Sequence, residues 1–106
     1  IELLHLSSER IMLVLGLDSG FIRSIVLNLN VTINNSSLKF INEALKDRLL
    51  GLSLDEIQSS IKERLKESQY FDHEIVQILV QDPNKHFKIS GEKLVSVSVS
   101  IRNKLL

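Results

Sequence analysis

Apolar runs separated by short polar breaks fill the first third of the chain, as expected of a β-sheet. Ile1–Leu6 is mostly apolar, and Ile11–Leu17 is a continuous apolar run typical of a central strand covered on both faces. Between Ile25 and Ile33 apolar residues fall at every second position, which predicts a strand with one buried face. Asp18-Ser19-Gly20 supplies turn-forming residues before this last stretch. Three strands in an antiparallel meander are therefore expected.

The spacing of apolar residues then changes to that of amphipathic helices. One stripe consists of Leu38, Ile41, Leu45 and Leu49, and a second consists of Leu54, Ile57, Ile61 and Leu65. Any residue of Asn34–Ser37 can cap the first helix, and Ser53 is expected to begin the second. Gly51 is a natural end for the first helix, because glycine tolerates the left-handed conformation there.

The last third of the chain predicts one more helix and a hairpin. A helix over about residues 71–81 would end at Asp82-Pro83-Asn84, because proline disfavours helical geometry in the residue before it. Residues 86–90 and 94–101 are expected to be strands joined by a turn at 91–93. The predicted fold class is α+β, with an antiparallel meander, two to three helices and a further hairpin.

The length and the net charge of the chain limit its number of domains and the classes of function that it can have. The 106 residues suffice for one core, so a single domain over residues 1–106 is expected. Thirteen Lys and Arg balance thirteen Asp and Glu, which gives a formal net charge of zero. A free-standing nucleic-acid-binding domain usually has a basic surplus, because neutralising phosphates supplies much of its affinity. If the parent protein binds DNA, another segment is therefore expected to do so.

The remaining compositional features predict a cytoplasmic protein that does not enter a membrane. The chain has no cysteine, which excludes disulfides and thiolate chemistry. No apolar run approaches the roughly 20 residues needed to cross a bilayer, and no signal segment leads the chain. The first residue is Ile1 rather than Met, so the chain is expected to be part of a longer protein.

The three histidines do not form a metal-binding pattern. His5, His73 and His86 lack the i, i+4 spacing that places two ligands on one helix face. His73 lies within Asp72-His73-Glu74 at the predicted start of the third helix, where capping and solvent exposure are the expected roles.

Other polar groups are also explained by ordinary structure. The carboxylates fall in a first helical turn or on exposed helix faces, at Glu43, Asp47, Asp55, Glu56, Glu63 and Glu67. Lys62, Arg64 and Lys66 form a short basic cluster that neighbouring acids dilute, as on a solvated helix face. Gly16–Gly20 lacks the Gly-Lys-Ser/Thr ending of a phosphate loop, and no serine lies in a nucleophile elbow. No catalytic, cofactor-binding or metal-ligating residue is predicted, and an enzyme is not expected.

Four stretches of the chain resemble, in order and spacing, the HrcA family of heat-inducible transcription repressors. They are Ile1–Leu6, Val14–Gly20, Leu45–Gly51 and Ser53–Ile57. The family carries a "hydrophobic-Glu-Leu" strand, a "Val-Thr-Asp-Ser-Gly" hairpin and a "Gly-x-Thr/Ser-Leu-Asp/Glu-Glu-Ile" helix boundary. His86–Leu94 is a looser match to a later strand-and-glycine segment.

The resemblance implies a repressor of chaperone operons that binds its operator as a dimer and responds to the chaperonin. It also implies a winged-helix DNA-binding domain before this chain, with the chain itself forming part of a GAF-like α+β domain. The expected partners are the chaperonin and a second copy of the repressor, while the DNA operator is contacted only by the winged helix. No cofactor is implied.

Two functions from different classes are open. The first is a non-catalytic, dimerisation-associated regulatory domain that acts through protein contacts. The alternative is a GAF-type small-molecule sensor with a pocket between the meander and the helices. Such pockets are apolar with a few convergent polar groups, and the sequence nominates no such group.

Overall fold

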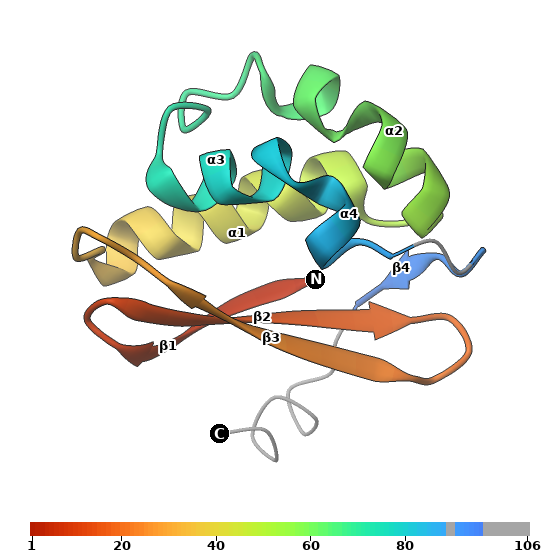
Figure 1. Cartoon of the computed structure of the whole chain (residues 1–106), viewed down its shortest axis with the longest axis horizontal. Coiled ribbons are helices and arrows are strands. Elements are labelled where there is room, and N and C mark those ends of the chain that lie inside the picture. The colour runs from red at the N-terminus through yellow and green to blue at the C-terminus, as the bar shows by residue number, and fades with distance from the viewer. Residues whose placement is uncertain (89–90, 97–106) are drawn as a thin grey trace.

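Three N-terminal strands form an antiparallel sheet, and this confirms the predicted meander. The computed structural model describes residues 1–88 and 91–96. β1 (Glu2–Ser7), β2 (Arg10–Leu17) and β3 (Ile22–Asn28) are arranged in the order β1-β2-β3, with β2 in the centre (Figure 1). Leu13 of β2 is paired with Leu3 on one side and with Ile25 on the other.

The period-two pattern directs one side of the sheet into the core. The buried strand residues of this side are Leu3, Ile11, Leu13, Leu15, Leu17 and Leu27. Val14 points to the opposite side of β2 and is also fully buried. The central strand is therefore buried on both faces at this position, as its continuous apolar run predicts.

The first long helix covers this side of the sheet and begins at a predicted cap. α1 (Asn35–Leu49) follows Asn34, whose Oδ1 accepts a hydrogen bond from Ser37 N at 2.8 Å. The helix ends just before Gly51, which has φ +88°. Both features were expected from the sequence, because they depend on neighbouring residues only.

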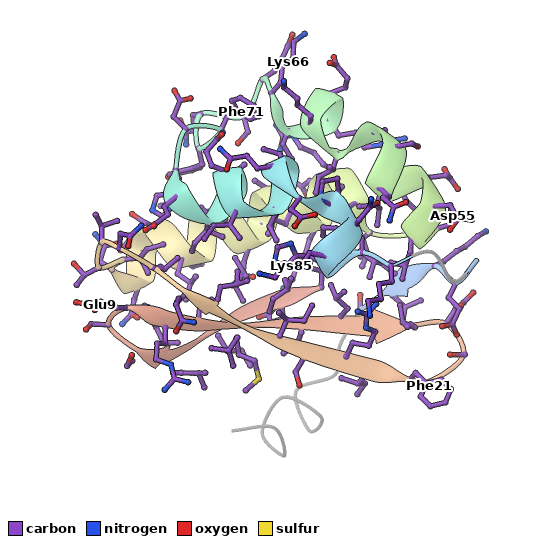
Figure 2. All side chains as sticks on the ribbon, in the orientation of Figure 1. Glu9, Phe21, Asp55, Lys66, Phe71 and Lys85 are labelled. Carbon is purple, nitrogen blue, oxygen red and sulfur yellow. The ribbon has the colours of Figure 1, made fainter. Side chains whose placement is uncertain are left out.

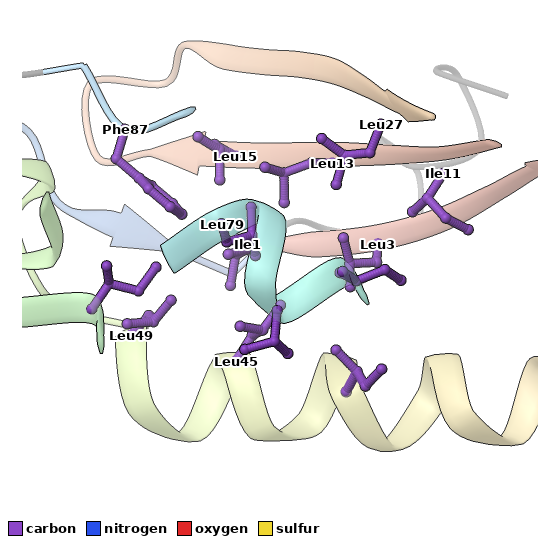
Figure 3. Packing of buried hydrophobic residues seen from close by; sticks show 14 of the residues in the cluster. Ile1, Leu3, Ile11, Leu13, Leu15, Leu27, Leu45, Leu49, Leu79 and Phe87 are labelled. Carbon is purple, nitrogen blue, oxygen red and sulfur yellow. The ribbon is translucent and has the colours of Figure 1, made fainter. Parts of the chain in front are cut away.

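The second helix packs beside the first and has a complete capping box. α2 (Leu54–Leu65) follows Ser53, whose Oγ accepts a hydrogen bond from Glu56 N at 3.1 Å, while the Glu56 carboxylate accepts one from Ser53 N. The buried side chains of the two helices are the predicted stripes. Figure 3 shows how Leu45 and Leu49 of α1 fill the layer below the sheet.

The third helix starts later than predicted. α3 (Glu74–Gln81) follows His73, and Phe71 lies in the turn before it, half-buried against the core. Ile75, Val76 and Leu79 are the buried side chains of α3. The helix ends before Pro83, as expected.

The predicted strand over residues 86–90 is wrong for the residues that the structure describes. Pro83–His86 forms a short helix, α4, with Pro83 in its first turn, where the missing N–H removes no hydrogen bond. Phe87 follows and is fully buried in the core. The apolar character of this stretch therefore reflects one buried aromatic side chain, and residues 89–90 lie outside the described residues.

The last described strand joins the N-terminal sheet. β4 (Leu94–Val95) pairs antiparallel with β2, through Gly16 with Val95 and Leu17 with Leu94. The strand predicted over residues 94–101 is present here, but its partner in the described part of the chain is β2 and not a hairpin arm. Residues 97–101 lie outside the described residues.

Candidate functional site

The Asp18-Ser19-Gly20 segment, which contributes to the family resemblance, is a tight turn between β2 and β3. Gly20 has φ +96°, a left-handed conformation that favours glycine. Its N–H donates to Leu17 O at 2.9 Å, and Phe21 N donates to Ser19 Oγ at 3.4 Å. A strand follows this turn, whereas a phosphate-binding loop leads into a helix. The prediction that the segment is a hairpin tip is confirmed.

Asp18 ties this turn to a segment far along the chain. Asp18 N donates to Lys93 O at 3.0 Å. Asp18 Oδ1 accepts a hydrogen bond from Lys93 N at 3.3 Å across a sequence separation of 75 residues. Asp18 therefore favours the turn and, through its carboxylate, also binds the backbone of Lys93.

The same late segment is tied, on its other side, to the corner between α1 and α2. Hydrogen bonds run from Leu94 N to Leu52 O (2.9 Å), from Gly51 N to Leu94 O (2.9 Å) and from Leu54 N to Glu92 O (2.8 Å). We call Asp18, Gly51–Leu54 and Glu92–Leu94 the junction. It links the sheet to the helical layer, next to β4 in Figure 1, and it contains residues of three of the four stretches that carry the resemblance to the family.

Beside the junction an apolar side chain projects from the hairpin tip. Phe21 is 72% exposed and points away from the helices in Figure 2. A shallow hollow of about 130 Å³ lies next to it. The hollow is lined by Gly16, Leu17, Gly20, Phe21, Ile22, Val95 and Ser96. Its described lining is mainly apolar, so it can contact apolar side chains.

A second apolar feature lies on the side of the sheet away from the helices. Leu4, Met12 and Val26 are register neighbours on the three strands, and we call them the outward row. They alternate with core residues such as Leu13, so they point to the opposite side. Leu4 and Met12 are half-buried, and Val26 is 42% exposed. This side of the sheet therefore presents apolar surface.

The three histidines lie in separate places and make local contacts. His5 Nε2 is 3.0 Å from Ile33 O, and His73 Nδ1 accepts a hydrogen bond from Ile75 N at 3.2 Å as the cap of α3. His86 Nδ1 is 3.1 Å from Asp82 O, and burial lowers the pKa of this imidazole. Within residues 1–88 and 91–96 no group of three or more His, Cys, Asp or Glu side chains could hold a metal ion.

Glu74 has a role that the sequence does not reveal. Both its carboxylate oxygens accept a hydrogen bond from Asn30 N at 2.9 Å, and one of them also accepts from Val31 N at 3.2 Å. Glu74 thereby fastens the loop after β3 to the start of α3. The sequence places Glu74 at a helix start but gives no sign of a partner 44 residues earlier.

The charged helix faces are exposed, as predicted. Lys66 Nζ lies 3.3 Å from Glu63 Oε2, and Arg64 Nε donates to Ser60 Oγ at 2.8 Å. Both are contacts within one helix turn on the solvent side, and such exposed pairs contribute little stability. In the described part of the chain no helix is long and apolar enough to cross a membrane.

Comparison with known proteins decides the family. The sequence model described as "HrcA protein C terminal domain" matches residues 1–105. The chain belongs to the HrcA family. Its match to the family model covers every element described above, including the junction. No solved structure matches the chain.

Relatives of this HrcA chain bear the name "Heat-inducible transcription repressor HrcA". One from Prosthecochloris aestuarii is 40% identical over 65 residues, which is 61% of this chain and 18% of the relative. One from Chlorobaculum tepidum is 37% identical over 67 residues, 63% of this chain and 19% of the relative. One from Chlorobium phaeobacteroides strain BS1 is 36% identical over 87 residues, 82% of this chain and 24% of the relative. The chain thus spans about a fifth to a quarter of the length of these relatives.

Proposed function

We propose that this HrcA chain is a regulatory region of a heat-inducible transcription repressor, and that it acts through contacts with other protein molecules rather than through catalysis. The supporting observation is the outward row, with Val26 42% exposed on the side of the sheet opposite to the helices. Exposed apolar side chains grouped on one face are typical of an interaction surface. Phe21, at the hairpin tip, extends the apolar surface at one end of the sheet.

The partners that we propose for this surface are a second copy of the repressor and the chaperonin. In this proposal the chain is one GAF-like domain over residues 1–106, associated with dimerisation. The operator is bound by a winged-helix domain elsewhere in the parent protein. The formal net charge of zero agrees with this division, because a DNA-contacting domain usually carries a basic surplus.

The junction offers a physical route by which warming changes these contacts. It consists of four backbone–backbone hydrogen bonds and the bond to the Asp18 carboxylate. Each contributes about 0.5–1.5 kcal/mol net, so the junction contributes a few kcal/mol and opens before the core does. Opening frees the hairpin tip from the α1–α2 corner, and we propose that this alters the dimer and releases the operator.

The alternative, a GAF-type sensor of a small molecule, requires space between the sheet and the helices. In the described residues that layer is filled by fully buried side chains such as Leu13, Leu15 and Leu45 (Figure 3). This packing favours protein contacts over an interior ligand. A thermal-shift screen with a metabolite library tests the alternative, which would be supported by a reproducible rise in melting temperature.

The main proposal is tested by measuring binding of the chain to purified chaperonin immobilised on a sensor surface. Val26→Asp places a charge in the outward row. Val31→Asp is the matched control, because Val31 is 55% exposed in the loop after β3. We expect Val26→Asp to weaken binding at least about tenfold and Val31→Asp to leave it unchanged, with both variants melting near the wild type.

The proposal fails if the wild-type chain binds the chaperonin no better than an unrelated folded protein of the same size. It also fails for the outward row if both variants bind equally well. Sedimentation of the same proteins measures self-association, where Val26→Asp is expected to lower the dimer fraction and Val31→Asp is not.

A further inference from the structure

The outer edge of β3 has backbone groups available for another strand. The bonds from Leu17 N to Phe21 O (2.9 Å) and from Leu29 N to Glu9 O (2.7 Å) fix which residues of β3 face β2. In an antiparallel ladder bonded and non-bonded residues alternate. Ser24 and Val26, which fall between the bonded positions, therefore direct their N–H and C=O groups away from β2. Within residues 1–88 and 91–96 these groups have no hydrogen-bond partner.

The opposite edge of the sheet is closed by a side chain. Asn42 of α1 accepts a hydrogen bond from Leu3 N at 2.6 Å and donates one to Leu3 O at 2.9 Å. A single amide thus takes the place of a neighbouring strand at Leu3, near the start of β1. Proteins commonly cover edge strands in such ways, because an open edge accepts any extended segment. β3 has no comparable cover among the described residues.

A groove of about 250 Å³ runs along the open edge. It is lined by Ile25, Val26, Leu27 and Asn28 of β3, by Ile78 of α3, and by Lys85 and His86 of α4. Lys85 is exposed and, among the described residues of this lining, is the one charged side chain at neutral pH, because burial lowers the pKa of His86. Arg23 lies two residues before Ile25 on the same strand. Figure 2 shows Lys85 between α4 and the sheet.

We infer that β3 and this groove bind an extended segment of a partner protein, which adds a strand to the sheet and places an acidic side chain opposite Lys85. The backbone groups of Ser24 and Val26 supply the pairing, and the apolar side chains of Ile25 and Ile78 in the lining can contact alternate side chains of the segment. The cations Arg23 and Lys85 select acidic segments. They also disfavour β3 of a second copy, which would bring the same cations to the same edge. Val26 belongs both to this surface and to the outward row, but the strand pairing uses its backbone whereas the outward row uses its side chain, so the inference does not rest on the proposed function.

The test measures fluorescence polarisation of a labelled peptide, Thr-Glu-Val-Glu-Val-Glu-Thr-Glu, and of a matched peptide with Lys at every Glu position. We expect the chain to bind the acidic peptide at least about tenfold more tightly. Ser24→Pro removes one outward N–H without breaking a bond to β2, since proline is tolerated where an edge N–H faces solvent. It is expected to lower the affinity about tenfold, whereas Ser24→Thr, which keeps the N–H, is not.

A second pair of variants tests the charge independently of the backbone. Lys85→Glu is expected to reduce the preference for the acidic peptide at least about tenfold, and Lys62→Glu, on the exposed face of α2, is expected to leave it unchanged. The inference is overturned if the wild type prefers the basic peptide, or if Lys85→Glu and Lys62→Glu behave alike. It is also overturned if folded Ser24→Pro binds like the wild type, or if Ser24→Pro but not Ser24→Thr lowers the dimer fraction in sedimentation, because a second copy would then occupy the edge.

Discussion

Replacement of Asn42 by alanine tests how the edge of β1 is closed. In the structure, the Asn42 amide and the Leu3 backbone exchange two hydrogen bonds, at 2.6 and 2.9 Å, and Leu3 is fully buried. Asn42→Ala removes both bonds at once and leaves one donor and one acceptor of β1 without a partner. Few single substitutions in the described chain would affect two backbone groups of a buried residue.

The magnitude follows from the cost of unsatisfied groups. A buried donor or acceptor that loses its partner costs about 1–3 kcal/mol. Two such groups near an edge, where water has some access, cost about 2–4 kcal/mol. Alanine regains about 0.6 kcal/mol through its higher helix propensity. The expected loss is therefore about 1.5–3.5 kcal/mol, and at about 4 °C per kcal/mol for a domain of this size the melting temperature falls by at least about 6 °C.

Thermal and urea unfolding followed by circular dichroism measures this loss. Asn28→Ala is the control, because Asn28 is an exposed asparagine of β3 whose side chain makes no hydrogen bond within the described residues. An exposed change of this kind shifts stability by at most about 0.5 kcal/mol. The reasoning is refuted if Asn42→Ala and Asn28→Ala melt together, or if exchange of the Leu3 amide hydrogen is not faster in Asn42→Ala.

Three further predictions concern the core, the helix corner and pH. Leu45→Ala leaves a cavity under the sheet and should destabilise the chain by about 2–5 kcal/mol, measured by urea unfolding. Gly51→Ala should cost about 1–2 kcal/mol in the same assay, because Gly51 has φ +88°. Burial lowers the pKa of His86 below its usual 6.5, so the unfolded chain binds the proton more readily. The free energy of unfolding should therefore fall as the pH drops below about 6.5, and His86→Gln should flatten that fall.

Each of these outcomes has a clear opposite. Equal stability of Leu45→Ala and the wild type would mean that the helix layer is not packed on the sheet. A Cβ at Gly51 would meet no neighbouring atom within 4 Å, so any loss of stability in Gly51→Ala comes from the backbone conformation and not from a clash. Unchanged stability of Gly51→Ala would contradict the predicted strain. A pH profile for His86→Gln that parallels the wild type would contradict the role of the buried imidazole.

Features that depend on neighbouring residues could be predicted from the sequence. The caps at Asn34 and Ser53 and the turn at Gly20 are of this kind, and all three occur where expected. Their physical causes act within about four residues, so a short stretch of sequence contains them completely. The buried stripes of α1 and α2 follow from the spacing of apolar residues at every third or fourth position, which is also a local feature.

Features that depend on distant partners could not be predicted. The stretch after Pro83 was predicted to be a strand, but it continues as a short helix, and His86 and Phe87 are buried by the elements around them. In the sequence Glu74 looks like any acidic residue in a first helical turn, yet its carboxylate binds the backbone of the loop after β3. The junction is the largest such case. Nothing in the sequence around Asp18 or Gly51–Leu54 indicates that both segments form hydrogen bonds with Glu92–Leu94.

The junction also determines when the chain can finish folding. Asp18 and Lys93 are separated by 75 residues, so their contact closes a loop that includes most of the chain. Closing such a loop costs entropy that is recovered only when the intervening helices are already in place. During synthesis the meander and the first helices leave the ribosome well before Lys93. The sheet and the α1–α2 corner therefore remain unlinked until translation has passed this segment. A nascent chain that stops earlier leaves the hydrogen-bonding groups of Asp18 and of Gly51–Leu54 exposed at the same time.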